Sequence, residues 1–297
     1  MIVEKAARET LTAVELDLGD ELVFALAGGD VRRVVLEKSW STVHETNLAD
    51  THQPRHGGRT VCRCACQLRI DGHAVQMVRW IGSQRSFYQP RELFGMRIWF
   101  DGNQDLFEHL LENHGPCRPG KRARFAVQDA SRRICPVLLH PWCPLPPGSL
   151  RIEDCYEGLD CWMGPYWGGE AHGGLDVNHP AGTPIWAPVA VDDHEMFDHV
   201  DRGANNNRWR GVHGWADGSV WRLGVSHVIR LLVPEHEPVP AGTQLAEGAG
   251  MLTGSHEHSH FTFAVREPGA GPGDEILLDP WILFWQMYQD RRLTAAP

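Results

Sequence analysis

The chain has 297 residues, of which 42% are hydrophobic and 22% charged, a composition that excludes collagen, coiled coil and a disordered chain. Lysine and arginine number 28 against 38 aspartates and glutamates, so the formal net charge is −10 and no general positive field exists to hold a nucleic-acid backbone. No stretch approaches the roughly 20 consecutive apolar residues of a membrane-spanning helix. We therefore expect a folded protein with no nucleic-acid partner and no membrane span.

The start of the chain and its cysteines leave the cellular compartment open. Residues 1–9 show neither the apolar core nor the small-residue cleavage site of a secretory signal. The 8 cysteines permit disulfide bonds but do not assign them, because many pairings are possible.

Short alternating segments separated by Gly, Pro, Asn and Asp recur throughout the chain. This pattern predicts a mostly β fold with antiparallel sheets. Helical periodicity favours only two segments, 104–113 and 280–292.

Three cysteines at two-residue spacing, Cys62, Cys64 and Cys66, look at first like a metal-binding cluster. The same spacing continues into Leu68 and Ile70, however, and the intervening positions are mostly polar. Such alternation is typical of a strand with one buried face, and a free cysteine packs as a small apolar side chain. We expect a buried strand here rather than a metal site.

A proline-dense segment, 136–147, interrupts the chain near its middle. Prolines at this density suit an extended connection better than the interior of an element. We place a domain boundary there, with a β-rich amino-terminal domain over 1–150 and a second domain over 151–297. Histidines are scattered through the first domain without a catalytic pattern, so its role, accessory or inhibitory, stays open.

The first motif that carries chemistry puts His172 and Asp176 four residues apart, with Gly173 and Gly174 between them. Paired glycines disfavour a helix interior, so a turn leading into a strand is expected. Alone, this spacing is also compatible with a hydrogen-bonded surface pair. A metal site requires a further ligand.

The second motif lies at 254–265, where Phe261 and Phe263 set one face of a strand by their alternation. His258 and His260 share the other face, roughly 6.5–7 Å apart along the strand. At that distance one ring can bind a metal while the other reaches the water or substrate at the metal. A histidine-rich surface loop is the alternative, which the apolar alternation argues against.

Two histidines and one aspartate form a donor set that suits zinc, and three protein ligands leave a fourth position for water. The pKa of zinc-bound water falls to about 7, and the metal can polarise a carbonyl and stabilise an oxyanion. The donor set therefore predicts a hydrolytic rather than a structural zinc site.

Together the motifs resemble the lysostaphin-type (LytM-type) zinc endopeptidases, metallopeptidase family twenty-three, which cut peptide cross-links in bacterial peptidoglycan. The resemblance covers about half of the chain, from near residue 165 to 265, and rests on His172-Gly173-Gly174-Leu175-Asp176, on Gly182-Thr183-Pro184 with Ala187 after it, and on His258-Ser259-His260-Phe261. It implies a lysostaphin-like domain of antiparallel sheets, with His172, Asp176 and His260 as zinc ligands and His258 as a catalytic histidine. Phe261 directly after His260 favours this pair over His256 and His258.

The family has a further catalytic histidine at the end of a central strand, for which His227 is the best match by resemblance. A core histidine remains the alternative, because His227 is in phase with the apolar positions of its own segment. The long segment between Val191 and Val220 also contains three other candidates for this role: His194, His199 and His213.

Several tryptophans lie near the motifs, and aromatic surfaces pack against peptide and sugar alike. Trp167, just before the first motif, and Trp209, in the long segment, are candidates for a substrate groove. Core packing is the alternative for both.

The expected function is therefore that of a zinc-dependent endopeptidase that hydrolyses peptide bonds in peptidoglycan cross-links or stem peptides. Such a substrate implies a site of action in the cell envelope, periplasmic or extracellular. The alternative is a non-enzymatic or latent cell-envelope module of the same fold, which serves in binding or regulation.

Overall fold

The computed structural model describes residues 1–46, 60–110, 113–114, 117–156, 162–166, 170–197, 207–249 and 258–294. The chain divides into two compact units, one of residues 1–136 with 162–173 and the other of residues 137–161 with 174–297. Along the chain, the first change from one unit to the other thus falls between residues 136 and 137. This position lies inside the proline-dense segment and upstream of residue 150. Residues 162–173 group with the first unit because their strands pair there.

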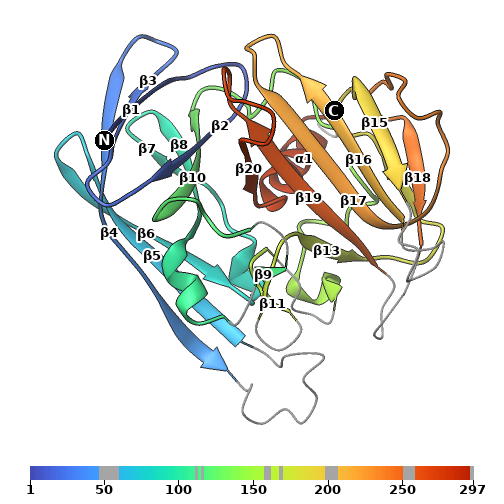
Figure 1. Cartoon of the computed structure of the whole chain (residues 1–297), viewed down its shortest axis with the longest axis horizontal. Helices are drawn as coiled ribbons and strands as arrows, with labels where there is room; N and C mark the ends of the chain where they lie inside the picture. The colour runs from blue at the N-terminus through green and yellow to red at the C-terminus, as the bar shows by residue number, and fades with distance from the viewer. Residues whose placement is uncertain are drawn as a thin grey trace. The chain divides into compact units, whose positions relative to one another are not determined.

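The first unit contains two main sheets and one small one (Figure 1). The five-stranded sheet has the order β1 (Ile2–Ala6), β3 (Glu21–Ala25), β4 (Val31–Thr46), β5 (Thr60–Ile70) and β6 (His73–Ile81). The four-stranded sheet has the order β2 (Thr12–Leu16), β10 (Ala123–Asp129), β8 (Met96–Asn103) and β7 (Arg91–Leu93). The small sheet has the order β11 (Pro165–Tyr166), β12 (Glu170–His172) and β9 (Asn113–His114).

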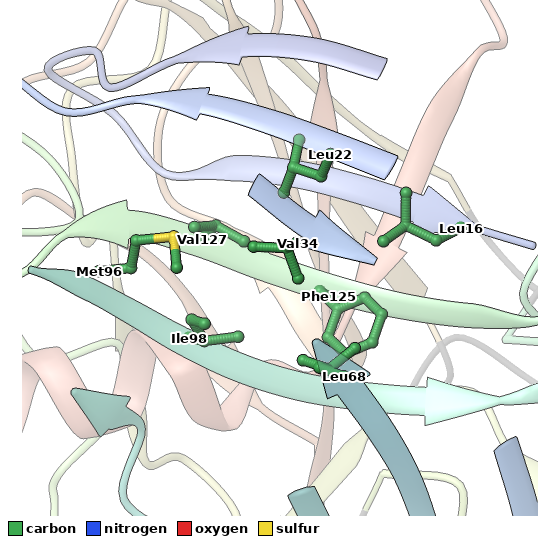
Figure 2. Close-up of a pocket in the computed structure, with 8 residues that line it drawn as sticks. All are labelled: Leu16, Leu22, Val34, Leu68, Met96, Ile98, Phe125 and Val127. Atoms are coloured by element: carbon green, nitrogen blue, oxygen red, sulfur yellow. The ribbon is translucent and has the colours of Figure 1, made fainter. Parts of the chain in front are cut away.

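Apolar side chains of the two main sheets face one another in the first unit, as Figure 2 shows. Leu22, Val34 and Leu68 come from the five-stranded sheet and meet Ile98 and Phe125 of the four-stranded one. This face-to-face packing is that of a β-sandwich.

The cysteine-rich segment is strand β5, as expected. Cys62, Cys64 and Cys66 are at most 2% exposed, whereas Arg63 and Gln67 are only half-buried. Among the described residues, none of these cysteines belongs to a group of side chains that could hold a metal ion. Burial raises the pKa of the Cys64 thiol to about 11, which keeps it protonated at neutral pH.

The segment 104–113, expected to be helical, differs in the structure. It contains a 3-10 helix, η3 (Gln104–Glu108), and the short strand β9 at its end. Among the described residues of this segment, only Leu106 and Leu110 are buried apolar side chains, which is too few to hold a longer amphipathic helix against a sheet. Elsewhere in the described part of the chain, the 3-10 helices are η2 (Gln84–Ser86) and η4 (Ile152–Asp154).

The second unit is built around one eight-stranded sheet. Its main path has the order β13 (Leu175–Asn178), β19 (His258–Arg266), β17 (Val220–Leu231), β16 (Asn207–Gly214) and β15 (Asp193–Phe197). Strands off this path are β14 (Pro184–Trp186), β18 (Gln244–Gly248) and β20 (Glu275–Leu278). All pairings in this sheet are antiparallel, in agreement with the predicted fold class.

The predicted carboxy-terminal helix is confirmed as α1 (Trp281–Thr294). The Asp279 carboxylate accepts a hydrogen bond from the Trp281 backbone N–H at 2.8 Å, and Pro280 follows Asp279, the arrangement of a capped helix start. Phe284 packs on Phe261 of β19, with ring centroids 5.3 Å apart. In the described part of the chain, no helix has the length and apolarity to cross a membrane.

Candidate metal centre

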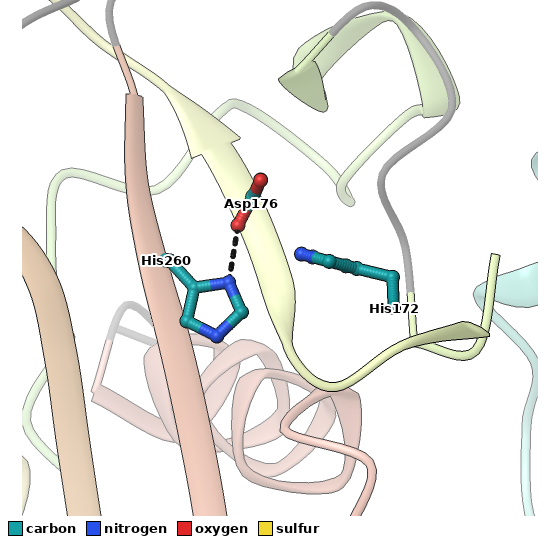
Figure 3. A group of neighbouring side chains, drawn as sticks. All are labelled: His172, Asp176 and His260. Carbon is teal, nitrogen blue, oxygen red and sulfur yellow. Dashed lines mark hydrogen bonds and ion pairs between the residues drawn. The ribbon is translucent and has the colours of Figure 1, made fainter. Parts of the chain in front are cut away.

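Asp176 and His260 lie directly opposite each other on the neighbouring strands β13 and β19. Oδ1 of Asp176 is 2.7 Å from Nδ1 of His260 (Figure 3). Gly174, just before β13, permits this approach, because a Cβ atom there would lie 2.3 Å from Cε1 of His260. Gly174, between His172 and Asp176 in the first motif, thus leaves the space that the His260 ring occupies.

His172, at the end of β12, completes a group of three with Asp176 and His260. Each side chain offers one ligand atom, and these atoms all lie within 4.8 Å of one another. His172 and Asp176 are 1% and 2% exposed. Figure 3 shows the His172 ring directed toward the carboxylate of Asp176.

The donor set fits zinc in number and type. Two imidazoles and one carboxylate match the three-ligand pattern of hydrolytic zinc sites, whose nitrogen and oxygen ligands lie about 2.0–2.2 Å from the ion. Within the described residues, this is the single group of three or more such side chains near enough to share an ion.

His258 lies one pleat from His260 on the same strand. Its side chain is 6% exposed, and its Nε2 atom lies 3.5 Å from Oδ2 of Asp176. The two carboxylate oxygens of Asp176 thus face different histidines, Oδ1 toward His260 and Oδ2 toward His258.

His227 follows Ser226, the residue of β17 that pairs with His260, and its ring lies near the same group. Its ring centroid lies 4.7 Å from that of His258 and 6.5 Å from that of His260. The His227 backbone has φ = 62°, a left-handed conformation that is uncommon for residues other than glycine, next to an irregularity in the pairing of β17. Burial, together with the neighbouring His258, lowers the pKa of His227 to about 3, so its ring is neutral at physiological pH.

Comparison with known proteins gives no match to any protein-family model or to any curated protein. Among solved structures, the chain is similar to the catalytic domain of lysostaphin, an antimicrobial peptidase from Staphylococcus simulans, at 20% identity and a TM-score of 0.30, over 48% of this chain and 86% of that one. A protein from Pseudomonas aeruginosa described as a putative peptidase M23 matches over 94% of both chains at 16% identity and a TM-score of 0.33. A zinc-containing peptidase from Vibrio cholerae matches over 90% of this chain and 83% of that one, at 12% identity and a TM-score of 0.34.

Of the histidines that compete with His227, two lie elsewhere in the sheet. His194 is buried against Trp209, whose indole N–H donates to its Nδ1 atom at 3.3 Å. Nδ1 of His213 is 3.2 Å from Oδ1 of Asp192. His199 lies outside the described residues.

The structure describes only one of the two tryptophans considered for a substrate groove. Trp167 lies outside the described residues. Trp209 is 2% exposed, so its indole has almost no surface to offer a substrate and contributes to the packing of the sheet.

Two neighbours of the site carry no signal in the sequence motifs. The Tyr156 ring stacks on His258, and Nε2 of His179 lies 2.7 Å from Oγ of Ser259, between the two histidines of β19. His179 could have been suspected from its place three residues after Asp176, whereas nothing local marks Tyr156.

Proposed function

We propose that this chain is a zinc-dependent endopeptidase that hydrolyses peptide bonds in the cross-links or stem peptides of bacterial peptidoglycan. The observation that carries the proposal is the gathering of the ligand atoms of His172, Asp176 and His260, with the rings of His258 and His227 beside them. Three protein ligands suit a catalytic site better than a structural one, because a structural zinc site has four.

His172, Asp176 and His260 would hold the metal. When bound, zinc supplies a Lewis acid that polarises a peptide carbonyl and lowers the pKa of water to about 7. The chain's own contribution is to hold these ligands in a buried site, where electrostatic interactions are stronger than in water.

The two remaining histidines suit different tasks. His258 faces a carboxylate oxygen of Asp176, so it can accept a proton at Nε2 and hold it for the leaving amine. His227 is neutral at physiological pH and keeps one ring N–H, which can donate to the oxygen that becomes negative as the peptide bond breaks.

We further propose that the chain is a member of the lysostaphin-type family and acts in the cell envelope, periplasmic or extracellular, where its substrate lies. The motif residues that carry the resemblance support this, because His172, Asp176, His258 and His260 converge in the structure.

The test is digestion of purified peptidoglycan by the wild-type protein, by His260→Ala and by the control His73→Ala, an exposed histidine of the first unit. Metal content is determined for each protein, and released fragments are read by mass spectrometry. We expect about one zinc per chain and new peptide termini from the wild type and the control, and neither from His260→Ala. A folded wild type without zinc would favour the non-enzymatic module, and bound zinc without cleavage would contradict the peptidoglycan substrate.

A further inference from the structure

His258 contacts two aromatic rings in the second unit. The Tyr156 ring lies nearly parallel to it, with centroids 4.0 Å apart and an angle of 24° between the planes. The His227 ring meets His258 edge-on, at 4.7 Å and 64°. Tyr156 is 3% exposed and His258 5%, so the contact excludes water.

The segment that carries Tyr156 is fixed to the strand that carries Asp176. Cys155 forms an antiparallel bridge with Val177, the residue after Asp176. The Asn178 side chain donates to the Cys155 carbonyl at 2.9 Å. Backbone pairing thus connects Tyr156, through β13, to the same pair of strands that positions the proposed metal ligands.

The register of β13 and β19 explains why the stack reaches His258. Asn178 lies opposite His258, and Val177 lies opposite Ser259. A side chain anchored beside Val177 and Asn178 is therefore next to the first residue of β19. The ring of Tyr156 covers one face of the imidazole, and Nε2 of His258 lies 3.5 Å from Oδ2 of Asp176.

We propose that Tyr156 is a positioning residue for His258, and that the face of its ring, rather than its hydroxyl, holds the imidazole in the plane from which it exchanges protons with the substrate. An imidazole on a single Cα–Cβ stem can turn about two bonds, and a stacked ring restricts that rotation. The expected effect of Tyr156 on catalysis rests on the proposed function. The position of the His258 ring can be measured whether or not the protein has that function.

The first test is spectroscopic and needs no substrate. In nuclear magnetic resonance spectra, the ring protons of His258, identified by their loss in His258→Gln, should be shifted upfield by the stacked Tyr156 ring. Tyr156→Phe should keep that shift and Tyr156→Leu should remove it. An unchanged shift in Tyr156→Leu would overturn the proposal, even if the protein cleaves nothing.

The second test separates positioning from general stability. We expect Tyr156→Leu to lower kcat on peptidoglycan roughly three- to ten-fold at unchanged KM, the size of one aromatic contact, and Tyr156→Phe to restore it. Zinc content should stay at the wild-type value in both. Tyr288→Leu is the matched control, because Tyr288 is a 5% exposed tyrosine of α1 whose ring packs with Trp281 and whose hydroxyl donates to the Pro146 carbonyl.

Each result decides for or against the stack. Equal kcat in the wild type and Tyr156→Leu would overturn the proposal, as would a loss in Tyr156→Phe as large as that in Tyr156→Leu, which would point to the hydroxyl instead. A wild type that binds zinc but cleaves nothing would contradict the proposed function alone, because the ring-proton shift would still report whether Tyr156 holds His258.

Discussion

Asp176 bridges two histidines of one strand, with Oδ1 2.7 Å from Nδ1 of His260 and Oδ2 3.5 Å from Nε2 of His258. A proposed ligand and a proposed proton carrier therefore share one carboxylate. Any change to that carboxylate should affect metal binding and proton transfer together, whereas a change to His258 should affect proton transfer and leave metal binding intact.

Replacement of the carboxylate by an amide tests the first half of this relationship. We expect Asp176→Asn to lower zinc affinity by about 100-fold or more, because the site loses a negative charge and a ligand while the side chain keeps its size. Zinc per chain after dialysis against a weak chelator measures the effect. Asp192→Asn, at an exposed carboxylate that accepts from the Gly214 backbone, is the control and should keep its zinc. Equal zinc retention by both variants would remove Asp176 from the ligand set.

A methyl group at Gly174 should disturb the site without removing any ligand. The Cβ atom of Gly174→Ala would lie 2.5 Å from Nε2 of His260 and 2.6 Å from the Phe261 carbonyl oxygen, so β19 or the His260 ring must move. We expect weaker zinc binding and a lower Tm, with destabilisation of about 1–3 kcal/mol as for overpacking in general. Gly28→Ala, with nothing within 4 Å of its added Cβ, should leave both measurements unchanged. Wild-type zinc affinity in Gly174→Ala would show that the approach to His260 is not required.

The parts of the fold and site that could be predicted from the sequence are those governed by local periodicity. Alternation alone placed Cys62, Cys64 and Cys66 on a buried face and His258 and His260 on one side of β19. Asp279 and Pro280 likewise mark the start of α1, because a capping carboxylate and an early proline act within one turn.

What could not be predicted depends on contacts between distant segments. Tyr156 meets His258 only because Cys155 pairs with Val177, a register that no local pattern specifies. The left-handed backbone of His227 is equally hidden, since its phase with neighbouring apolar residues suggested an ordinary strand position. Residues 162–173 belong to the first unit because β12 pairs with β9. Both strands are short, and their sequences do not predict this pairing.

Loss of either proposed catalytic histidine should lower the rate of cleavage without loss of the bound metal. We expect His258→Gln and His227→Gln each to keep about one zinc per chain and to lower kcat by about 100-fold or more, the usual contribution of a proton-transfer group. His213→Gln should cleave at the wild-type rate, because His213 pairs with Asp192 elsewhere in the sheet. If His213→Gln instead lost activity and His227→Gln did not, the assignment of the second catalytic histidine would be reversed.

The depressed pKa of His227 should make the second unit sensitive to acid. The folded protein holds His227 neutral down to about pH 3, whereas an unfolded chain protonates it near pH 6.5. Between these values the unfolded state binds the extra proton, so the free energy of unfolding falls as the pH falls. His227→Asn removes the titrating group and tolerates the left-handed backbone, so between pH 7 and pH 5 it should lose less stability than the wild type, by about 2 kcal/mol. Urea unfolding of the chelator-treated proteins at both pH values measures the difference, with chelation preventing zinc release from contributing. Parallel losses in the two proteins would mean that His227 is protonated as readily in the folded state as in the unfolded one.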